Sequence, residues 1–226
     1  MNFYLLVEGR RTEAKIYPAW FSYLIPNFKR VKSFSDVTDN CYYLVSGFGY
    51  PSVIQDHFPN AVKDIKQVKK FNALVLALDA GESGYERRLK EVNDFAEKEK
   101  LIDNSYQLIV IVQNVCIETW LLGNRKIISR ASNKSKLKEY LRHYDILKKD
   151  PEKMDKYEGY NTKEQFHHDF LAETFKEKGI SYNKNNPGDA QKKFYLDEII
   201  KRTKENKDHL ESFQKFLEFC KETNNG

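Results

Sequence analysis

The chain has 226 residues, of which 40% are hydrophobic, 31% charged and 14% aromatic, and its formal net charge is +5. These proportions are those of a globular protein with a sizeable core, and 10 Gly and 6 Pro are too few for a low-complexity or fibrous chain. No apolar run is long enough to span a bilayer, and the first residues lack the pattern of a secretion signal. The composition therefore predicts a cytoplasmic protein without membrane contact.

The cysteine pattern agrees with that compartment. Cys41, Cys116 and Cys220 lie far apart in the sequence, and none has a second Cys or a His at zinc-ligand spacing. We expect them to be reduced, buried thiols.

The first half of the chain alternates between strand and helix patterns. A continuous apolar run of five to seven residues indicates a strand covered on both faces, and helical spacing of apolar residues follows each run. This order predicts an α/β fold with a mainly parallel sheet and right-handed crossovers. The expected strands are Phe3–Val7, Cys41–Val45, Asn72–Leu78 and Tyr106–Val112, and the expected helices are Thr12–Leu24, Pro51–Val68, Tyr85–Lys100 and, less regular, Val115–Leu122.

The pattern changes after Gly123, where strands stop and helical periods dominate. We expect residues 1–123 to form the sheet domain and residues 124–226 to form a mainly helical extension packed on it. Near the C-terminus an apolar stripe recurs at helical spacing, which fits either a buried helix face or the seam of a homodimer. The stripe consists of Leu210, Phe213, Phe216, Leu217 and Cys220.

Carboxylates follow the ends of three expected strands. Glu8 ends the first strand, Asp79 ends the third with Glu82 close behind, and Glu118 follows the fourth. If the first and third strands are neighbours, their carboxylates meet in the crevice where open parallel sheets bind ligands. Oxygen ligands without His or Cys suit Mg²⁺ or Mn²⁺, which can activate a phosphodiester. The alternative is that Asp79 and Glu82 only complement the next helix and Glu8 is a solvated turn residue.

These residues carry a family resemblance. Leu6-Val7-Glu8-Gly9 followed by Thr12-Glu13, and an apolar strand ending in Asp79-Ala80-Gly81-Glu82, resemble the TOPRIM domain over residues 2–122. The resemblance implies a TOPRIM-like fold and a metal-dependent nucleic-acid cleavage centre. In that centre Glu8 is the general acid/base or a metal ligand, and the acidic pair of the third strand holds Mg²⁺.

Two further segments narrow the resemblance. Residues 114–122 (Asn-Val-Cys-Ile-Glu-Thr-Trp-Leu-Leu) and 184–188 (Lys-Asn-Asn-Pro-Gly) are similar to small TOPRIM proteins of bacterial anti-phage systems. These include the overcoming-lysogenization-defect and RloB-like groups and the TOPRIM effector of PARIS-type defence. The resemblance implies an endonuclease that cuts tRNA or DNA and is controlled by a separate ATPase. The sequence has no G-x-x-x-x-G-K-[ST] phosphate loop, so ATP hydrolysis of that kind would come from the partner.

The sequence departs from the family at one position. The second aspartate of the family's Asp-x-Asp pair is Gly81 here. Three interpretations stay open: Glu82 substitutes for it, Glu118 supplies the missing ligand, or the site is weakened. A weakened site would make the chain a TOPRIM-like module that binds nucleic acid or an ATPase partner without cutting. A nucleotide-binding or phosphotransfer enzyme ranks last, because no phosphate loop is present.

Basic residues supply candidate contacts for nucleic acid. Residues 125–142 contain seven basic and one acidic residue, whereas the rest of the chain is nearly neutral. Such a cluster favours phosphate binding, although a solvated helix face has the same pattern. Arg10 and Arg11 directly follow Glu8, where a substrate phosphate would lie. The remaining candidates are Arg125, Lys126, Arg130, Lys134 and Lys184.

Two other groups have weaker functional interpretations. His167-His168-Asp169 is a metal-binding candidate, but adjacent helical residues point in different directions and no third ligand has suitable spacing. Aromatic residues near the second expected strand could stack on bases, although most aromatic side chains are core residues. These are Tyr42, Tyr43, Phe48 and Tyr50.

Overall fold

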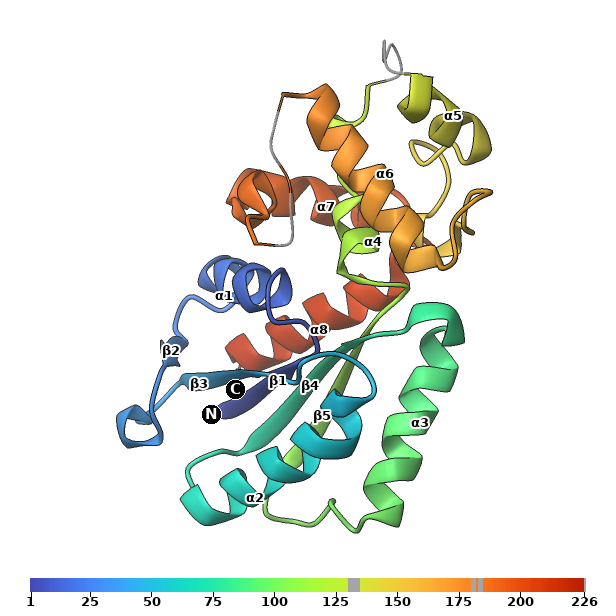
Figure 1. Ribbon diagram of the computed structural model, residues 1–226. Coiled ribbons are helices and arrows are strands. Elements are labelled where there is room, and N and C mark those ends of the chain that lie inside the picture. The colour runs from blue at the N-terminus through green and yellow to red at the C-terminus, as the bar shows by residue number, and fades with distance from the viewer. Residues whose placement is uncertain (130–134, 180–181, 183–184, 226) are drawn as a thin grey trace.

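The structure is a computed structural model that describes residues 1–129, 135–179, 182 and 185–225. Within these residues five parallel strands form one sheet in the order β2-β3-β1-β4-β5 (Figure 1). The predicted α/β class and the parallel sheet flanked by helices are confirmed. The strands are β1 (Phe3–Val7), β2 (Lys29–Val31), β3 (Cys41–Ser46), β4 (Ala73–Asp79) and β5 (Gln107–Gln113).

The central strand β1 and its neighbour β4 are continuous apolar runs, as expected for strands that helices cover on both faces. Alternate side chains of β1 enter different cores: Phe3, Leu5 and Val7 pack on one face, and Tyr4 and Leu6 on the other. All four expected strands are present, displaced by at most one residue at an end. The unexpected fifth strand, β2, has only three residues and two exposed charges, as is common at a sheet edge.

Helices cover both faces of the sheet and its carboxyl edge. In Figure 1, α2 and α3 lie on one face, α1 and α8 lie on the other, and α4 to α7 lie beyond the strands' carboxyl ends. A π-helical turn at Val53–His57 precedes α2 within the helix expected from Pro51. In the described part of the chain, no helix is both long and apolar enough to cross a membrane. The helices are α1 (Glu13–Leu24), α2 (Phe58–Val68), α3 (Tyr85–Lys98), α4 (Ile117–Leu121), α5 (Ser135–His143), α6 (Lys163–Glu177), α7 (Lys193–Glu205) and α8 (Glu211–Asn225).

The C-terminal helix returns to the sheet and completes one of its two cores. On α8, Phe213 and Phe216 pack against Trp120, with ring centroids 5.3 and 5.5 Å away. Phe219 of the same helix meets Phe3 of β1 edge to face at 5.8 Å. The apolar stripe of α8 is therefore a buried helix face, the first of its two interpretations, and the segment after Gly123 shares a core with the sheet.

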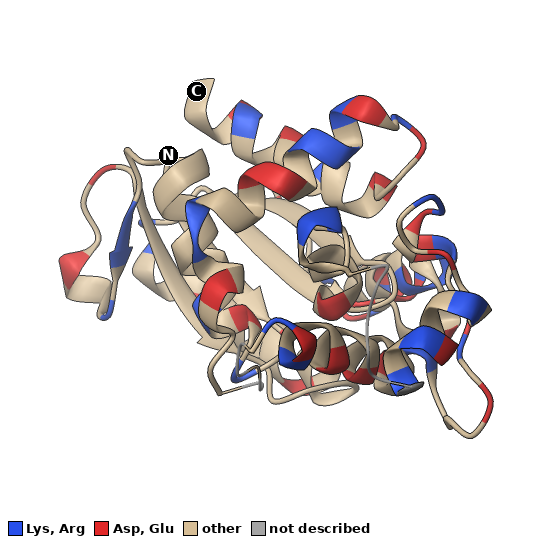
Figure 2. Ribbon diagram, turned by 90° about the horizontal axis from the view of Figure 1, so that it is seen from above, with Lys and Arg blue, Asp and Glu red and all other residues tan. Residues whose placement is uncertain are grey.

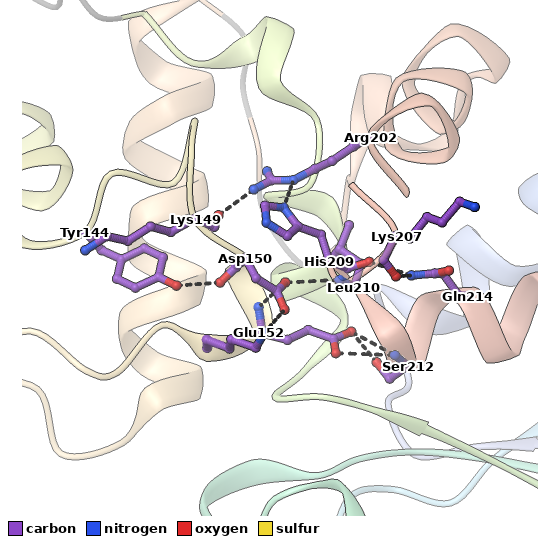
Figure 3. Close-up of polar contacts among 11 residues, drawn as sticks. Tyr144, Lys149, Asp150, Glu152, Arg202, Lys207, His209, Leu210, Ser212 and Gln214 are labelled. Atoms are coloured by element: carbon purple, nitrogen blue, oxygen red, sulfur yellow. Dashed lines mark hydrogen bonds and ion pairs between the residues drawn. The ribbon is translucent and has the colours of Figure 1, made fainter. Parts of the chain in front are cut away.

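A polar network fixes the start of α8 (Figure 3). The hydroxyl of Ser212 donates to Glu152 Oε1 at 2.5 Å, and its backbone N–H donates to the same oxygen at 3.2 Å. The indole N–H of Trp120 donates to Ser212 Oγ at 2.7 Å. Asp150 Oδ1 accepts the backbone N–H of Leu210 at 3.0 Å. These contacts join the loop before α6 to both α4 and α8.

Beside this network the buried guanidinium of Arg202 is satisfied inside the fold (Figure 3). It donates to the carbonyl oxygens of Ile146 and Lys149 at 2.9 and 2.5 Å, and to His209 Nδ1 at 3.3 Å. Burial lowers the pKa of Arg202 to about 10. Hydrogen bonds offset the cost of burying such a charge, so this arginine has a structural role.

Glu152 should make the stability of the fold depend on pH. Burial raises its pKa from 4.5 to about 7, with a further increase from Asp150, while hydrogen bonds from Ser212 oppose the shift. Between these values the folded state binds more protons than the unfolded state, so stability falls as pH rises and levels off above pH 7. At pH 8, Glu152→Gln should therefore be more stable than the wild type by about 1–3 kcal/mol.

Urea unfolding at pH 5 and pH 8 measures this difference. The exposed Glu139→Gln on α5 is the matched control and should leave the pH dependence unchanged. Parallel stability curves for Glu152→Gln and the wild type would show that Glu152 is ionised in the fold without penalty.

Candidate functional site

The pairing of β1 with β4 brings Glu8 and Asp79 together. The strands are parallel neighbours with Val7 opposite Ala77, so the residues that follow leave the same edge of the sheet. Glu8 Oε2 accepts the backbone N–H of Asp79 at 3.1 Å, and its Oε1 accepts that of Tyr50 at 3.2 Å. The condition on which the predicted crevice depended, that these two strands are adjacent, is met.

The crevice beside Glu8 is a hollow of about 290 Å³. The predicted phosphate contacts Arg10 and Arg11 line it and are exposed. A polyanion that enters this hollow therefore meets two cations at the point where Glu8 and Asp79 converge. The lining consists of Glu8, Gly9, Arg10, Arg11, Thr12, Glu13, Phe48, Gly49 and Asp79.

The surroundings of Glu8 tune its proton affinity. Burial raises the pKa of Glu8, and the negative charge of Glu164 adds to that increase. The hydrogen bonds from the backbone N–H groups of Asp79 and Tyr50 and the positive charge of Arg88 oppose it. A raised pKa makes the Glu8 carboxylate a stronger base, which is the property that a proton acceptor needs.

Arg88 is a site residue that sequence reasoning missed. Its Nε donates to the backbone oxygen of Asp79 at 3.1 Å, and its Nη1 contacts Glu91 at 2.7 Å. The guanidinium lies 3.9 Å from the centroid of the Tyr50 ring, and the Tyr50 hydroxyl donates to Glu91 at 2.9 Å. On the charged helix α3 this arginine resembles a solvent-facing residue, and only its packing on the end of β4 distinguishes it.

A second hollow of about 520 Å³ also has Asp79 in its lining. Glu118 lines it, is 3% exposed, and accepts the hydroxyl of Tyr182 at 3.3 Å. Glu118 therefore shares with Asp79 a hollow that Glu8 does not line. The lining consists of Asp79, Cys116, Glu118, Gly159, Tyr160, Glu164, Gln165, His168 and Asp169.

Glu82, the third predicted metal ligand, contacts the start of α6 instead. Its Oε1 accepts the backbone N–H of Lys163 at 2.5 Å, and it lines neither of the two hollows. The neighbouring Gly81 has φ +57°, and a Cβ there would come within 2.5 Å of Glu164 Oε1. The positive φ favours glycine at position 81, whereas the Glu164 carboxylate is the end of a flexible side chain that could move away from an added Cβ.

The donor set of this edge suits a hard cation. Among the described residues, no three His, Cys, Asp or Glu side chains form a group that could hold a metal. Mg²⁺ needs fewer, because it keeps several waters and commonly takes only one or two carboxylates from the protein. The carboxylates of Glu8 and Asp79 at adjacent strand ends therefore fit Mg²⁺ or Mn²⁺.

The two predicted nucleic-acid contacts after Gly123 that the structure describes, Arg125 and Lys126, have partners within the chain. Arg125 lies 3.3 Å from Glu205 and donates to Asn206 at 2.6 Å, and Lys126 lies 2.5 Å from Glu198. These contacts attach the turn at Arg125 to α7, away from both hollows. In Figure 2, Lys and Arg are interspersed with Asp and Glu along the helices. The predicted contacts Arg130, Lys134 and Lys184 lie outside the described residues.

The His167-His168-Asp169 segment does not form a joint ligand set. His167 is fully buried between the Met154 carbonyl oxygen at 3.0 Å and Thr119 Oγ1 at 2.7 Å, and burial lowers its pKa to about 4. Asp169 accepts a hydrogen bond from the hydroxyl of Tyr140 at 2.6 Å and forms an ion pair with Lys136. Of these three residues, only His168 and Asp169 belong to the lining of the second hollow.

The aromatic candidates divide into core and surface residues. Tyr42 is 3% exposed and Tyr43 is partly buried, so both are packing residues. Phe48 and Tyr50 are 59% and 49% exposed. Arg10 lies 4.7 Å from the Phe48 ring centroid, and the ring of His57 stacks on Phe48 at 5.3 Å. Phe48 therefore lines the first hollow, whereas the Tyr50 ring packs against Arg88.

Comparisons with protein-family models, with curated proteins and with solved structures found no match for this chain. The resemblance to TOPRIM proteins therefore stands on the motif residues of the sequence.

Proposed function

We propose that the chain is a Mg²⁺-dependent endonuclease that hydrolyses phosphodiester bonds in nucleic acid. The observation that carries this proposal is the pairing of Glu8 with Asp79 at adjacent strand ends, where the Glu8 carboxylate accepts the Asp79 N–H at 3.1 Å. The hollow in front of them is lined by Arg10 and Arg11. Carboxylates for a hard cation and guanidinium groups for phosphate are the two components that such chemistry needs.

In this proposal each residue has a defined role. Arg10 and Arg11 bind the phosphates that flank the scissile bond, and Glu8 accepts a proton from the attacking water and returns it to the leaving oxygen. Glu8 and Asp79 would hold the cation. Bound Mg²⁺ would supply charge neutralisation at the phosphate and activation of the nucleophile. Arg88 holds the Asp79 backbone and restrains the pKa of Glu8.

The biological part of the proposal rests on the TOPRIM resemblance. It makes the chain a cytoplasmic effector of bacterial anti-phage defence that cuts tRNA or DNA. A separate ATPase partner would supply control.

A second candidate is a binding module without catalysis. It is favoured by Gly81, which replaces the family's second aspartate, and by Glu82, whose carboxylate binds the start of α6. The two candidates differ in what Glu8 does, because a binding module has no use for a proton acceptor in the crevice.

Glu8→Gln and Asp79→Asn should each reduce cleavage of total RNA or DNA at least about 100-fold, because each removes a carboxylate from the reacting centre. Gel analysis of both polymers with Mg²⁺, with and without a candidate ATPase, measures this loss. Each variant needs a thermal melt, since Glu8 accepts two backbone hydrogen bonds.

Glu86→Gln, an exposed carboxylate on the first turn of α3, is the matched control and should cut like the wild type. Undiminished cleavage by a folded Glu8→Gln protein would rule out the proposed centre. Retained binding of nucleic acid by a wild-type protein that never cuts it would support the binding module.

Phe48→Ala should weaken binding of a single-stranded 12-mer, measured by fluorescence anisotropy in EDTA, by about 5- to 100-fold, because stacking on one base contributes about 1–3 kcal/mol. Binding of the same sequence as a duplex should change little, since its bases are already stacked. Phe194→Ala is the control: Phe194 is 54% exposed and has a lysine Nζ 5.8 Å from its ring, but lies on α7. Equal affinity of Phe48→Ala and wild type for single strands would exclude a stacking role.

A further inference from the structure

Glu164, on the first turn of α6, reaches the end of β4 from a distant part of the chain. Its Oε1 lies 2.5 Å from where a Cβ of residue 81 would be. The Glu164 carboxylate therefore occupies the space that a side chain at Gly81 would enter. Position 81 is where the TOPRIM pattern has its second aspartate, so an acidic group is present there even though Gly81 carries none.

The second oxygen of the Glu164 carboxylate is a buried atom that lacks a hydrogen bond among the described residues. Glu164 Oε2 is inaccessible to solvent and has no hydrogen-bond partner within the described residues. A buried carboxylate oxygen normally accepts hydrogen bonds or binds a cation, because its desolvation is costly. Glu164 also lines the second hollow together with Asp79 and Glu118. The carboxylate that carries this unsatisfied oxygen therefore shares one cavity with the carboxylates of Asp79 and Glu118.

Helix capping does not explain this arrangement. The electrostatics of a helix N-terminus favour an acidic residue in the first turn, but other groups already satisfy the start of α6. Thr162 Oγ1 accepts the backbone N–H of Gln165 at 3.2 Å, and Glu82 Oε1 accepts that of Lys163 at 2.5 Å. Glu82 therefore holds the helix end, and Glu164 remains directed at the strand end.

We propose that Glu164 supplies the acidic ligand that Gly81 lacks. In this assignment Glu164 takes the place of Glu8 as the second ligand, so that Glu164 and Asp79 together hold the divalent cation and Glu8 is left as the proton acceptor. This inference rests on the proposed function, whose crevice it completes from α6. It assigns the role to a residue other than Glu82 and Glu118, which bind Lys163 N–H and the Tyr182 hydroxyl. Two carboxylates are sufficient for Mg²⁺ or Mn²⁺, which complete their shells with water.

The charge balance of the cavity agrees with a cation there. Glu164 lines this cavity, and Arg88 Nη2 would lie 3.8 Å from the same Cβ at position 81, so one guanidinium balances part of the negative charge. Asp79 and Glu118 add further negative charge around the same cavity. A divalent cation would relieve this repulsion and also satisfy Glu164 Oε2.

Binding of Mn²⁺ to the full-length protein, measured by electron paramagnetic resonance without nucleic acid, tests the assignment. Glu164→Gln should raise the Kd for Mn²⁺ by about 10-fold or more. Glu173→Gln is the matched control on the same helix, where Glu173 lies 3.6 Å from Lys176, and it should bind Mn²⁺ like the wild type. Without metal, Glu164→Gln should melt at or above the wild-type temperature, because it neutralises a carboxylate whose Oε2 is buried without a hydrogen-bond partner. A purely structural glutamate would instead lower the melting temperature.

A relocated carboxylate tests the geometry. Gly81→Asp alone should weaken Mn²⁺ binding, because its side chain collides with Glu164. Glu164→Ala should weaken it too, and the double variant should bind Mn²⁺ more tightly than Glu164→Ala, since aspartate tolerates a positive φ better than most residues. Tighter Mn²⁺ binding by the double variant than by Glu164→Ala would show that the ligand missing at Gly81 belongs at this end of β4.

The outcomes separate this inference from the proposed function. Unchanged Mn²⁺ affinity in Glu164→Gln, or no Mn²⁺ binding by the wild type, would overturn the assignment, and continued cleavage by the wild type would leave the nuclease standing. Glu164-dependent Mn²⁺ binding by a protein that cuts no nucleic acid would support the assignment and remove the nuclease.

Discussion

The parallel pairing of β1 with β4 is the constraint on which the rest of the site depends. It sets Val7 opposite Ala77, so Glu8 and Asp79 leave the sheet at one edge. There the Glu8 carboxylate accepts the Asp79 N–H and fixes its own orientation. A shift of one residue in this register would turn every side chain of β1 to the opposite face and separate the two carboxylates. The apolar packing on both faces of the sheet therefore determines the position of the polar groups at its edge.

The C-terminal segment does more than cover this sheet. Its helix α8 supplies Phe213 and Phe216 to the core beneath α1 and α4. Its helix α6 begins at the end of β4, where Glu82 binds the Lys163 N–H. The same attachment directs Glu164 toward the space above Gly81. Packing and site geometry are thus linked, because the helix that closes one side of the cavity also brings a carboxylate into it.

Buried polar groups in this fold fall into two kinds. Arg202 and His167 are buried with their hydrogen bonds satisfied, which is how a folded chain tolerates polar groups in its interior. Glu8, which follows β1, and Glu164, on the first turn of α6, are partly buried near the end of β4, where burial and like charge raise the pKa of Glu8. Groups whose charged form is disfavoured in this way concentrate at functional sites, since the lost stability can be recovered when a ligand binds.

The sequence by itself determined the parallel α/β class, the succession of strands and helices along the chain, and the placement of Glu8 and Asp79 at strand ends. It could do so because buried strands such as β1 and β4 are continuous apolar runs, and the residue that ends such a run is visible locally. It missed β2, whose three residues and exposed charges carry no such pattern. The positions of Arg88, Glu82 and Glu164 were decided only by tertiary structure. Contacts such as that between Glu82 and Lys163, 81 residues apart, depend on how α6 packs against the sheet, and no local periodicity encodes that.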